Sequence, residues 1–104
     1  HDDAYYVPVF VERMLMEART NNLELVYCDW LFDRADNTTP YHHMEGVPKF
    51  GRIDIGGFIV KRDVLVADGW KDNGEGGDGR LVERIAAKHR HGCVPDHRVL
   101  YVKN

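Results

Sequence analysis

The stretch of sequence that decides the fold reads Arg52-Ile-Asp-Ile-Gly-Gly-Phe-Ile-Val-Lys-Arg62, followed by Gly69-Trp70 and by Gly77-Asp-Gly-Arg-Leu81. Gly56 and Gly57 directly precede the apolar run 58–60. Because glycine has no Cβ, this pair lets the backbone turn and come close to a ligand or to another strand. We therefore expect a turn and then a strand, with a helical turn at 63–67 that ends at the next glycine.

Two amphipathic helices flank this stretch. Apolar residues recur at helical spacing in 8–20 and again in 79–90, with charged residues mostly on the other sides. Apolar segments at 23–28 and 99–102 are typical of strands. His91-Gly92 is the expected end of the second helix. The sequence thus predicts an α/β fold in which two amphipathic helices pack on a sheet.

The composition is that of a folded soluble protein, with 104 residues of which 43% are hydrophobic and 30% charged. This length allows one domain at most, and a chain that opens on His1 is expected to be a fragment. A net charge of −3 argues against nucleic acid as the partner. Cys28 and Cys93 suggest reduced thiols and a cytoplasmic location, with membrane association of the full-length protein left open.

Carboxylates stand at three expected element boundaries: Asp2-Asp3 before the first helix, Asp54 before the glycine pair, and Glu75 with Asp78 before the last helix. Adjacent acids repel each other, so Asp2-Asp3 either cap the helix or bind a hard cation, Mg²⁺ or Mn²⁺. Asp78 either caps its helix or acts as a general base toward an acceptor hydroxyl. On residue type alone, capping is the better interpretation of both.

The order of these pieces resembles the second half of family-two glycosyltransferases with the nucleotide-diphospho-sugar transferase (GT-A) fold. The matching segments are His1-Asp-Asp-Ala-Tyr-Tyr-Val-Pro-Val-Phe10, similar to the end of the family's Asp-x-Asp-Asp loop, then Leu25-Val-Tyr-Cys-Asp29, Gly56-Gly-Phe-Ile-Val-Lys-Arg62, Gly69-Trp70 and Gly77-Asp-Gly-Arg-Leu81. Their succession covers nearly the whole chain. The resemblance implies a partial GT-A, Rossmann-like mixed sheet, with residues 1–104 as the acceptor-binding half of the domain.

The resemblance also implies an activity: metal-assisted, inverting transfer of a sugar from a nucleotide-sugar donor to a hydroxyl of a glycan or other acceptor. Asp2 would bind the Mg²⁺ or Mn²⁺ that holds the donor diphosphate, with Asp3 beside it. Asp78 would be the catalytic base. The residues lining the donor and acceptor site would be Gly56, Gly57 and Trp70.

Two positions depart from the family. Gly77 replaces the acid that usually precedes the base, and Lys103 stands where many relatives carry a histidine metal ligand. A charged lysine cannot bind Mg²⁺ but can pair with a phosphate. His97 is too early in the sequence to be assigned as that ligand. A missing N-terminal nucleotide-binding half, or a second copy, would have to cover an exposed sheet edge of this chain.

Two rival interpretations use other residues. A small zinc-binding module would use four ligand-type side chains within nine residues, His89, His91, Cys93 and His97. Their spacing matches no usual zinc finger. A non-catalytic carbohydrate-binding or interaction domain would instead use Trp30, Trp70 and the tyrosines as stacking platforms.

Overall fold

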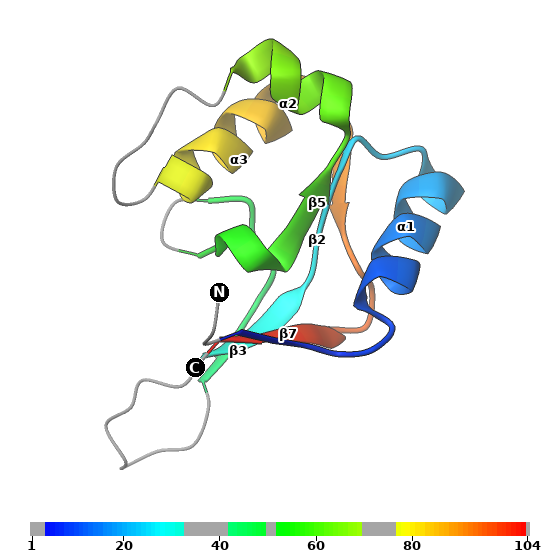
Figure 1. Ribbon diagram of the computed structural model, residues 1–104, viewed down its shortest axis with the longest axis vertical. Helices are drawn as coiled ribbons and strands as arrows, with labels where there is room; N and C mark the ends of the chain where they lie inside the picture. Colours follow the sequence, from blue (N-terminus) through cyan, green and yellow to red (C-terminus); the bar gives the residue numbers. More distant parts are fainter. Residues whose placement is uncertain (1–3, 33–41, 50–51, 70–76, 104) are drawn as a thin grey trace.

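The computed structural model describes residues 4–32, 42–49, 52–69 and 77–103. In chain order these form β1 (Ala4–Tyr6), α1 (Phe10–Asn21), β2 (Leu25–Tyr27), β3 (Asp29–Phe32), β4 (His42–Met44), the short 3₁₀ turn η1 (Ile55–Gly57), β5 (Phe58–Val60), α2 (Arg62–Asp68), α3 (Gly77–Lys88), β6 (His91–Cys93) and β7 (Val99–Lys103). Helices lie on both sides of the layer formed by β5, β2 and β6 (Figure 1). The arrangement is a layered α/β fold.

The strands form two mixed sheets. The first has the order β5-β2-β6, with β2 antiparallel to β5 and parallel to β6. The second has the order β1-β7-β3-β4, in which only the β3–β7 pair is parallel. Cys28 alone separates β2 from β3, so the chain passes directly from one sheet into the other. The predicted α/β fold is confirmed, although its strands are divided between two sheets.

Strand β2 is buried on both faces because helices cover each side of its sheet. Val26 packs in one core cluster with Phe10 and Met14 of α1, whereas Leu25 and Tyr27 pack in another cluster with α3. Successive residues of a strand point to opposite faces. The wholly apolar character of this segment follows from that double burial.

The segment predicted as a helical turn forms α2, so within the described ranges three helices pack on the sheets, and the sequence had predicted two. Gly69 ends α2 in the left-handed conformation, with a φ of 75°, and its N–H donates to the Leu65 carbonyl at 3.1 Å. Arg84 of α3 donates two hydrogen bonds, of 3.0 and 2.8 Å, to the carboxylate of Asp68. This bidentate pair fastens α2 to α3.

The expected helix end at His91-Gly92 is wrong. Helix α3 ends at Lys88, and His91–Cys93 is strand β6, which pairs with β2. A Cβ at position 92 would lie 2.9 Å from a methyl carbon of Leu23. The glycine therefore permits close packing within the sheet layer, and it does not stop a helix.

Leu81→Ala tests the contribution of α3 to the second core cluster. Leu81 is 0% exposed. Its truncation should lower the free energy of unfolding by about 2–5 kcal/mol, because burial is lost and a cavity remains. Urea denaturation followed by circular dichroism measures this. Val66→Ala is the control, since Val66 is 68% exposed and should change stability by less than about 0.5 kcal/mol. Equal losses in the two variants would contradict this packing.

Candidate functional site

Asp54 is a carboxylate, only 8% exposed, that joins the end of β7 to the turn η1. Its Oδ2 accepts hydrogen bonds from the Tyr101 hydroxyl at 2.7 Å and from the Gly56 N–H at 3.2 Å. Its Oδ1 accepts one from Lys103 Nζ at 2.7 Å. Tyr101 and Lys103 reach the same carboxylate because alternate residues of a strand share a face.

These hydrogen bonds keep Asp54 ionised. Burial pushes its pKa up, but the bonds from Lys103, Tyr101 and Gly56, with the positive charge of Lys103, outweigh burial. The pKa of Asp54 therefore lies below its ordinary value. The result is a partly buried ion pair at the end of β7.

Gly56 is required by the position of Tyr101. A Cβ at position 56 would lie 2.5 to 2.7 Å from atoms of the tyrosine ring and hydroxyl. At Gly57 the nearest ring atom would be 3.7 Å away, which is an ordinary contact. The Gly57 carbonyl accepts the Cys28 N–H at 3.2 Å. The close approach expected at the glycine pair is thus made to an aromatic ring of the same chain.

The first described residues pair with the strand that carries this ion pair. Asp2 and Asp3, like Trp70, lie outside the described residues. Ala4, the residue that follows the acids, stands opposite Lys103 in the antiparallel pairing of β1 with β7. The chain therefore enters the second sheet beside the lysine that holds Asp54.

Asp78 lies in the first turn of α3, as the preceding glycine-rich segment predicts, and its side chain is outside the described residues. Further along the helix, Leu81 and Val82 pack in one core cluster with Ile53, the residue before Asp54. Figure 1 shows the beginning of α3, drawn in yellow, toward the side of the molecule that carries η1. The packing of Ile53 thus links the start of α3 to the surroundings of Asp54.

Asp29 is the centre of a second buried carboxylate cluster, which sequence reasoning missed. Its Oδ2 accepts hydrogen bonds from His43 Nε2 at 2.7 Å and from His97 Nδ1 at 3.0 Å. Its Oδ1 accepts the Gly46 N–H at 2.8 Å, and Cys93 Sγ lies 3.8 Å from the same oxygen. The cluster joins β3 to the segment after β4, to the end of β6 and to the turn before β7.

The turn that carries His97 has an uncommon backbone. Asp96 and His97 adopt φ angles of 67° and 51°, which residues other than glycine visit rarely. Such a conformation persists when its surroundings fix it, and here the bond to Asp29 does so. His43 and His97 are 14 and 68 residues from Asp29 in the sequence, so no local pattern joins them. The one available signal was an aspartate that directly follows the apolar segment 23–28.

The residues of the zinc-binding alternative have separate partners. His89 bonds to Glu24 at 3.1 Å and His91 to Tyr27 at 2.8 Å, whereas the other two members of that set contact Asp29. In the parts of the chain that the structure describes, no three His, Cys, Asp or Glu side chains are arranged to hold a metal ion. The described geometry therefore gives no support to the zinc module.

Trp30 does not form the stacking platform expected of a carbohydrate-binding domain. Its side chain is buried, and its Nε1 donates to the Arg52 carbonyl at 3.3 Å. Tyr5 and Tyr6 on β1 are exposed. Among the described residues, the exposed aromatic side chains are therefore those that follow the acid pair in the sequence.

The family resemblance stands on the residues alone. No family model, curated protein or solved structure matches the chain. Of the helices described, none has the length and apolar character needed to cross a bilayer.

Gly56→Ala and Gly57→Ala form a matched pair that tests this geometry. The first substitution places a methyl group against the Tyr101 ring, so η1 or the ring must move. The free energy of unfolding should fall by about 1–3 kcal/mol, as in other overpacked sites. The second substitution meets only ordinary contacts and should cost less than half as much. Thermal unfolding of both variants measures the difference, and a larger loss in Gly57→Ala would contradict the described packing.

The two buried carboxylates should make stability fall in acid. For Asp29, burial raises the pKa, but hydrogen bonds from Gly46, His43 and His97 outweigh it, so the pKa lies below the usual 3.8. Asp54 is shifted in the same direction. Because both groups are more acidic folded than unfolded, the stability they add is complete above about pH 5 and is lost as the pH falls through their lowered values.

Asp29→Asn isolates one of these contributions. The variant should be less stable than the natural protein near neutral pH, because a buried carboxylate that accepts hydrogen bonds is replaced by a neutral amide. It should lose less stability than the natural protein between about pH 5 and pH 3, since position 29 no longer titrates. Urea titrations across this range measure both effects. Asp63→Asn, exposed on α2, should behave as the natural protein, and an unchanged acid dependence in Asp29→Asn would contradict the assignment.

Proposed function

We propose that this chain is the acceptor-binding half of an inverting glycosyltransferase, which moves a sugar from a nucleotide-sugar donor to a hydroxyl of a glycan or other acceptor. One observation carries the proposal: the strand that follows the acid pair, the glycine turn and the early part of α3 all connect to Asp54 or its neighbour. These pieces are far apart in sequence. They can form a single cleft only if the fold brings them close together in space.

Asp78 would act as the general base. The acceptor oxygen attacks the anomeric carbon, and its proton passes to the Asp78 carboxylate as the bond from that carbon to the diphosphate oxygen breaks. Attack from the side opposite the leaving group inverts the configuration. The position of Asp78 in the first turn of α3 also suits a negative charge, because the helix dipole is positive there. Capping and base catalysis are compatible.

The leaving diphosphate would be held by a cation. Mg²⁺ or Mn²⁺ bound through Asp2, with Asp3 beside it, would supply positive charge to the departing nucleoside diphosphate. Lys103 stands opposite Ala4, the residue that follows the acid pair in the sequence, and its ammonium is bonded to Asp54. Lys103 therefore suits direct pairing with a donor phosphate and does not suit a place among the metal ligands.

A non-catalytic carbohydrate-binding domain is the second candidate. Tyr5 is 55% exposed on β1, and an open aromatic face suits contact with a sugar ring, whereas the Tyr6 ring packs against Phe10 and Tyr101. Such a domain needs no acid at position 78. The two candidates therefore separate at Asp78.

Asp78→Asn distinguishes them. The amide keeps the size of the side chain but cannot accept the acceptor's proton. In protein that includes the nucleotide-binding half, transfer should fall at least about 100-fold while the nucleotide sugar still binds. Release of nucleoside diphosphate from a panel of nucleotide sugars, with Mn²⁺ or with a chelator, measures transfer, and calorimetry measures binding.

Asp63→Asn, an acid-to-amide change at the start of α2, is the matched control and should leave transfer unchanged. Transfer that survives in Asp78→Asn would end the assignment of this residue as the base. Sugar binding without transfer in the natural protein would favour the binding domain.

A further inference from the structure

The outward face of α1 carries a cluster of exposed apolar side chains. Val11, Leu15 and Met16 are 60%, 37% and 46% exposed, and they are three of the six large hydrophobic side chains that are exposed among the described residues. The opposite face of the helix packs into the first core cluster through Phe10 and Met14. Helix α1 is therefore apolar on two sides, and the described residues cover one of them.

Two charged side chains enclose the middle of this outward face. Residues three and four apart are neighbours on a helix surface, so Glu12 adjoins Leu15 and Met16 from one end. Arg19 adjoins the same two residues from the other end. Both charged side chains are exposed, and neither has an ion-pair partner in the described parts of the chain. These four residues form the α1 patch, which is acidic at one end, apolar in the middle and basic at the other end.

The α1 patch is complementary to itself. Positions 12 and 19 have the same midpoint as positions 15 and 16, so a two-fold axis through that midpoint sets two copies of α1 antiparallel. Glu12 of each copy then lies opposite Arg19 of the other, and Leu15 lies opposite Met16. Both charges gain a partner of opposite sign, and the apolar side chains between them are removed from water. Of the antiparallel registers, only this one sets Glu12 opposite Arg19.

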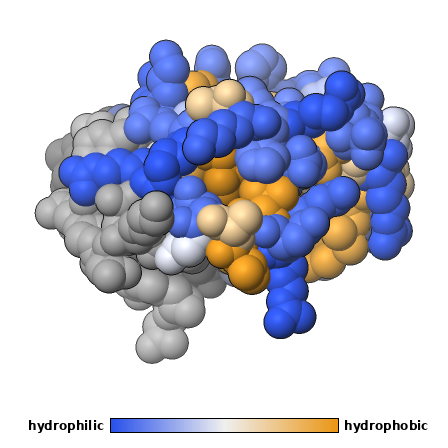
Figure 2. Space-filling model, turned by 90° about the horizontal axis from the view of Figure 1, so that it is seen from above, coloured by the Kyte–Doolittle hydropathy of each residue, from blue (hydrophilic) through white to orange (hydrophobic). Residues whose placement is uncertain are grey.

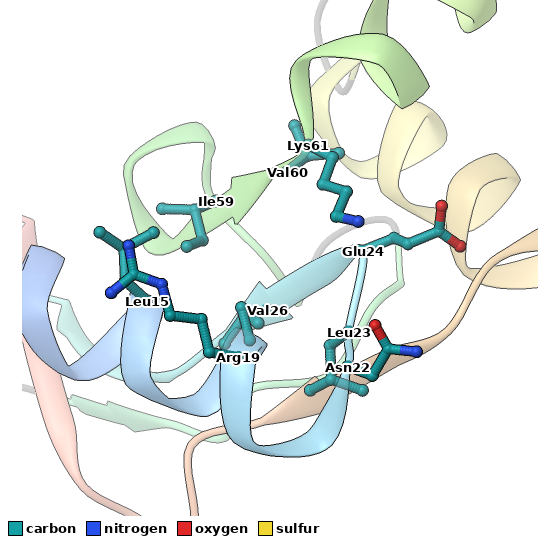
Figure 3. A pocket seen from close by; sticks show the side chains of 10 residues that line it. Leu15, Arg19, Asn22, Leu23, Glu24, Val26, Ile59, Val60 and Lys61 are labelled. Atoms are coloured by element: carbon teal, nitrogen blue, oxygen red, sulfur yellow. The ribbon is translucent and has the colours of Figure 1, made fainter.

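A groove beside α1 fits the same arrangement. It has a volume of about 300 Å³ and lies between α1 and β5, with Leu15 and Arg19 on the helix side and Ile59 on the strand side (Figure 3). Seen from above, apolar residues reach the surface between hydrophilic ones (Figure 2). Val11 lies one turn before Leu15 on the same side of the helix. The two-fold axis brings Val11 of one copy level with position 20 of the other, where it covers the groove.

We propose that a second copy of this chain docks on α1, with the two helices antiparallel about a two-fold axis between positions 15 and 16. The contact is small, because helices of 12 residues share only a few turns, so the association is weak and reversible. Helices α1 and α3 lie on opposite sides of the β5-β2-β6 layer (Figure 1). The pairing therefore leaves the α3 side open, and it is independent of the proposed function.

Charge reversal at either end of the α1 patch tests the pairing. Sedimentation equilibrium of the 104-residue chain, from about 10 μM to about 1 mM, measures self-association across the range expected of a small contact. Glu12→Arg or Arg19→Glu alone sets like charges opposite each other at both ends of the contact. Each should weaken self-association at least about 10-fold. Arg62→Glu is the control, because it makes the same charge change on an exposed residue of α2 and should leave self-association unchanged.

An equimolar mixture of Glu12→Arg and Arg19→Glu distinguishes this register from any other contact. One copy is then positive at both positions and its partner is negative at both, so opposite charges meet at both ends. The mixture should associate at least as tightly as the natural chain, which also shows that both variants are folded. A natural chain that stays monomeric over this range would overturn the proposal. So would a mixture that associates no more tightly than the separate variants, or association that neither variant weakens.

Discussion

The hydrogen bonds of Asp54 to Lys103 and Tyr101 are the constraint on which the candidate site depends. They fix the end of β7 against η1, and they hold the Tyr101 ring where position 56 has room for glycine only. Removing one partner of such a buried group costs about 1–3 kcal/mol, more than a surface ion pair usually contributes. Asp54 also caps η1, the turn that leads directly into β5.

Asp29 holds the segment before β7 by a hydrogen bond, as Asp54 holds the end of the strand. His97, two residues before β7, bonds to Asp29, while Tyr101 and Lys103 within the strand bond to Asp54. Strand β7 lies between β1 and β3, so one of the two inner strands of the second sheet is held at both of its ends. The two carboxylates are therefore first of all supports of the fold. At the Asp54 end, Lys103 also pairs with Ala4, the first described residue.

The sequence predicted the elements whose signal is local. The helical spacing in α1 and α3 and the apolar run of β2 were sufficient to predict these three elements, because each pattern reflects which residues of a single element are buried. Strands β1 and β6 were missed, since Ala4–Tyr6 and His91–Cys93 are strands only through pairing with distant segments. Asp54 was recognised as a boundary acid, but its partners are 47 and 49 residues away. Hydrogen bonds between residues so far apart produce no periodic pattern in the sequence.

The central claim is that the acid pair, the glycine turn and the start of α3 border one cleft. Titration of Mn²⁺ into isotopically labelled protein tests it most directly, because the ion broadens the nuclear resonances of amides near it. If these segments border one cleft, broadening should appear first at Ala4, Lys103 and Gly79, with Val66 unaffected. Broadening that is centred on the histidines around Asp29, or that is spread evenly over the chain, would contradict it.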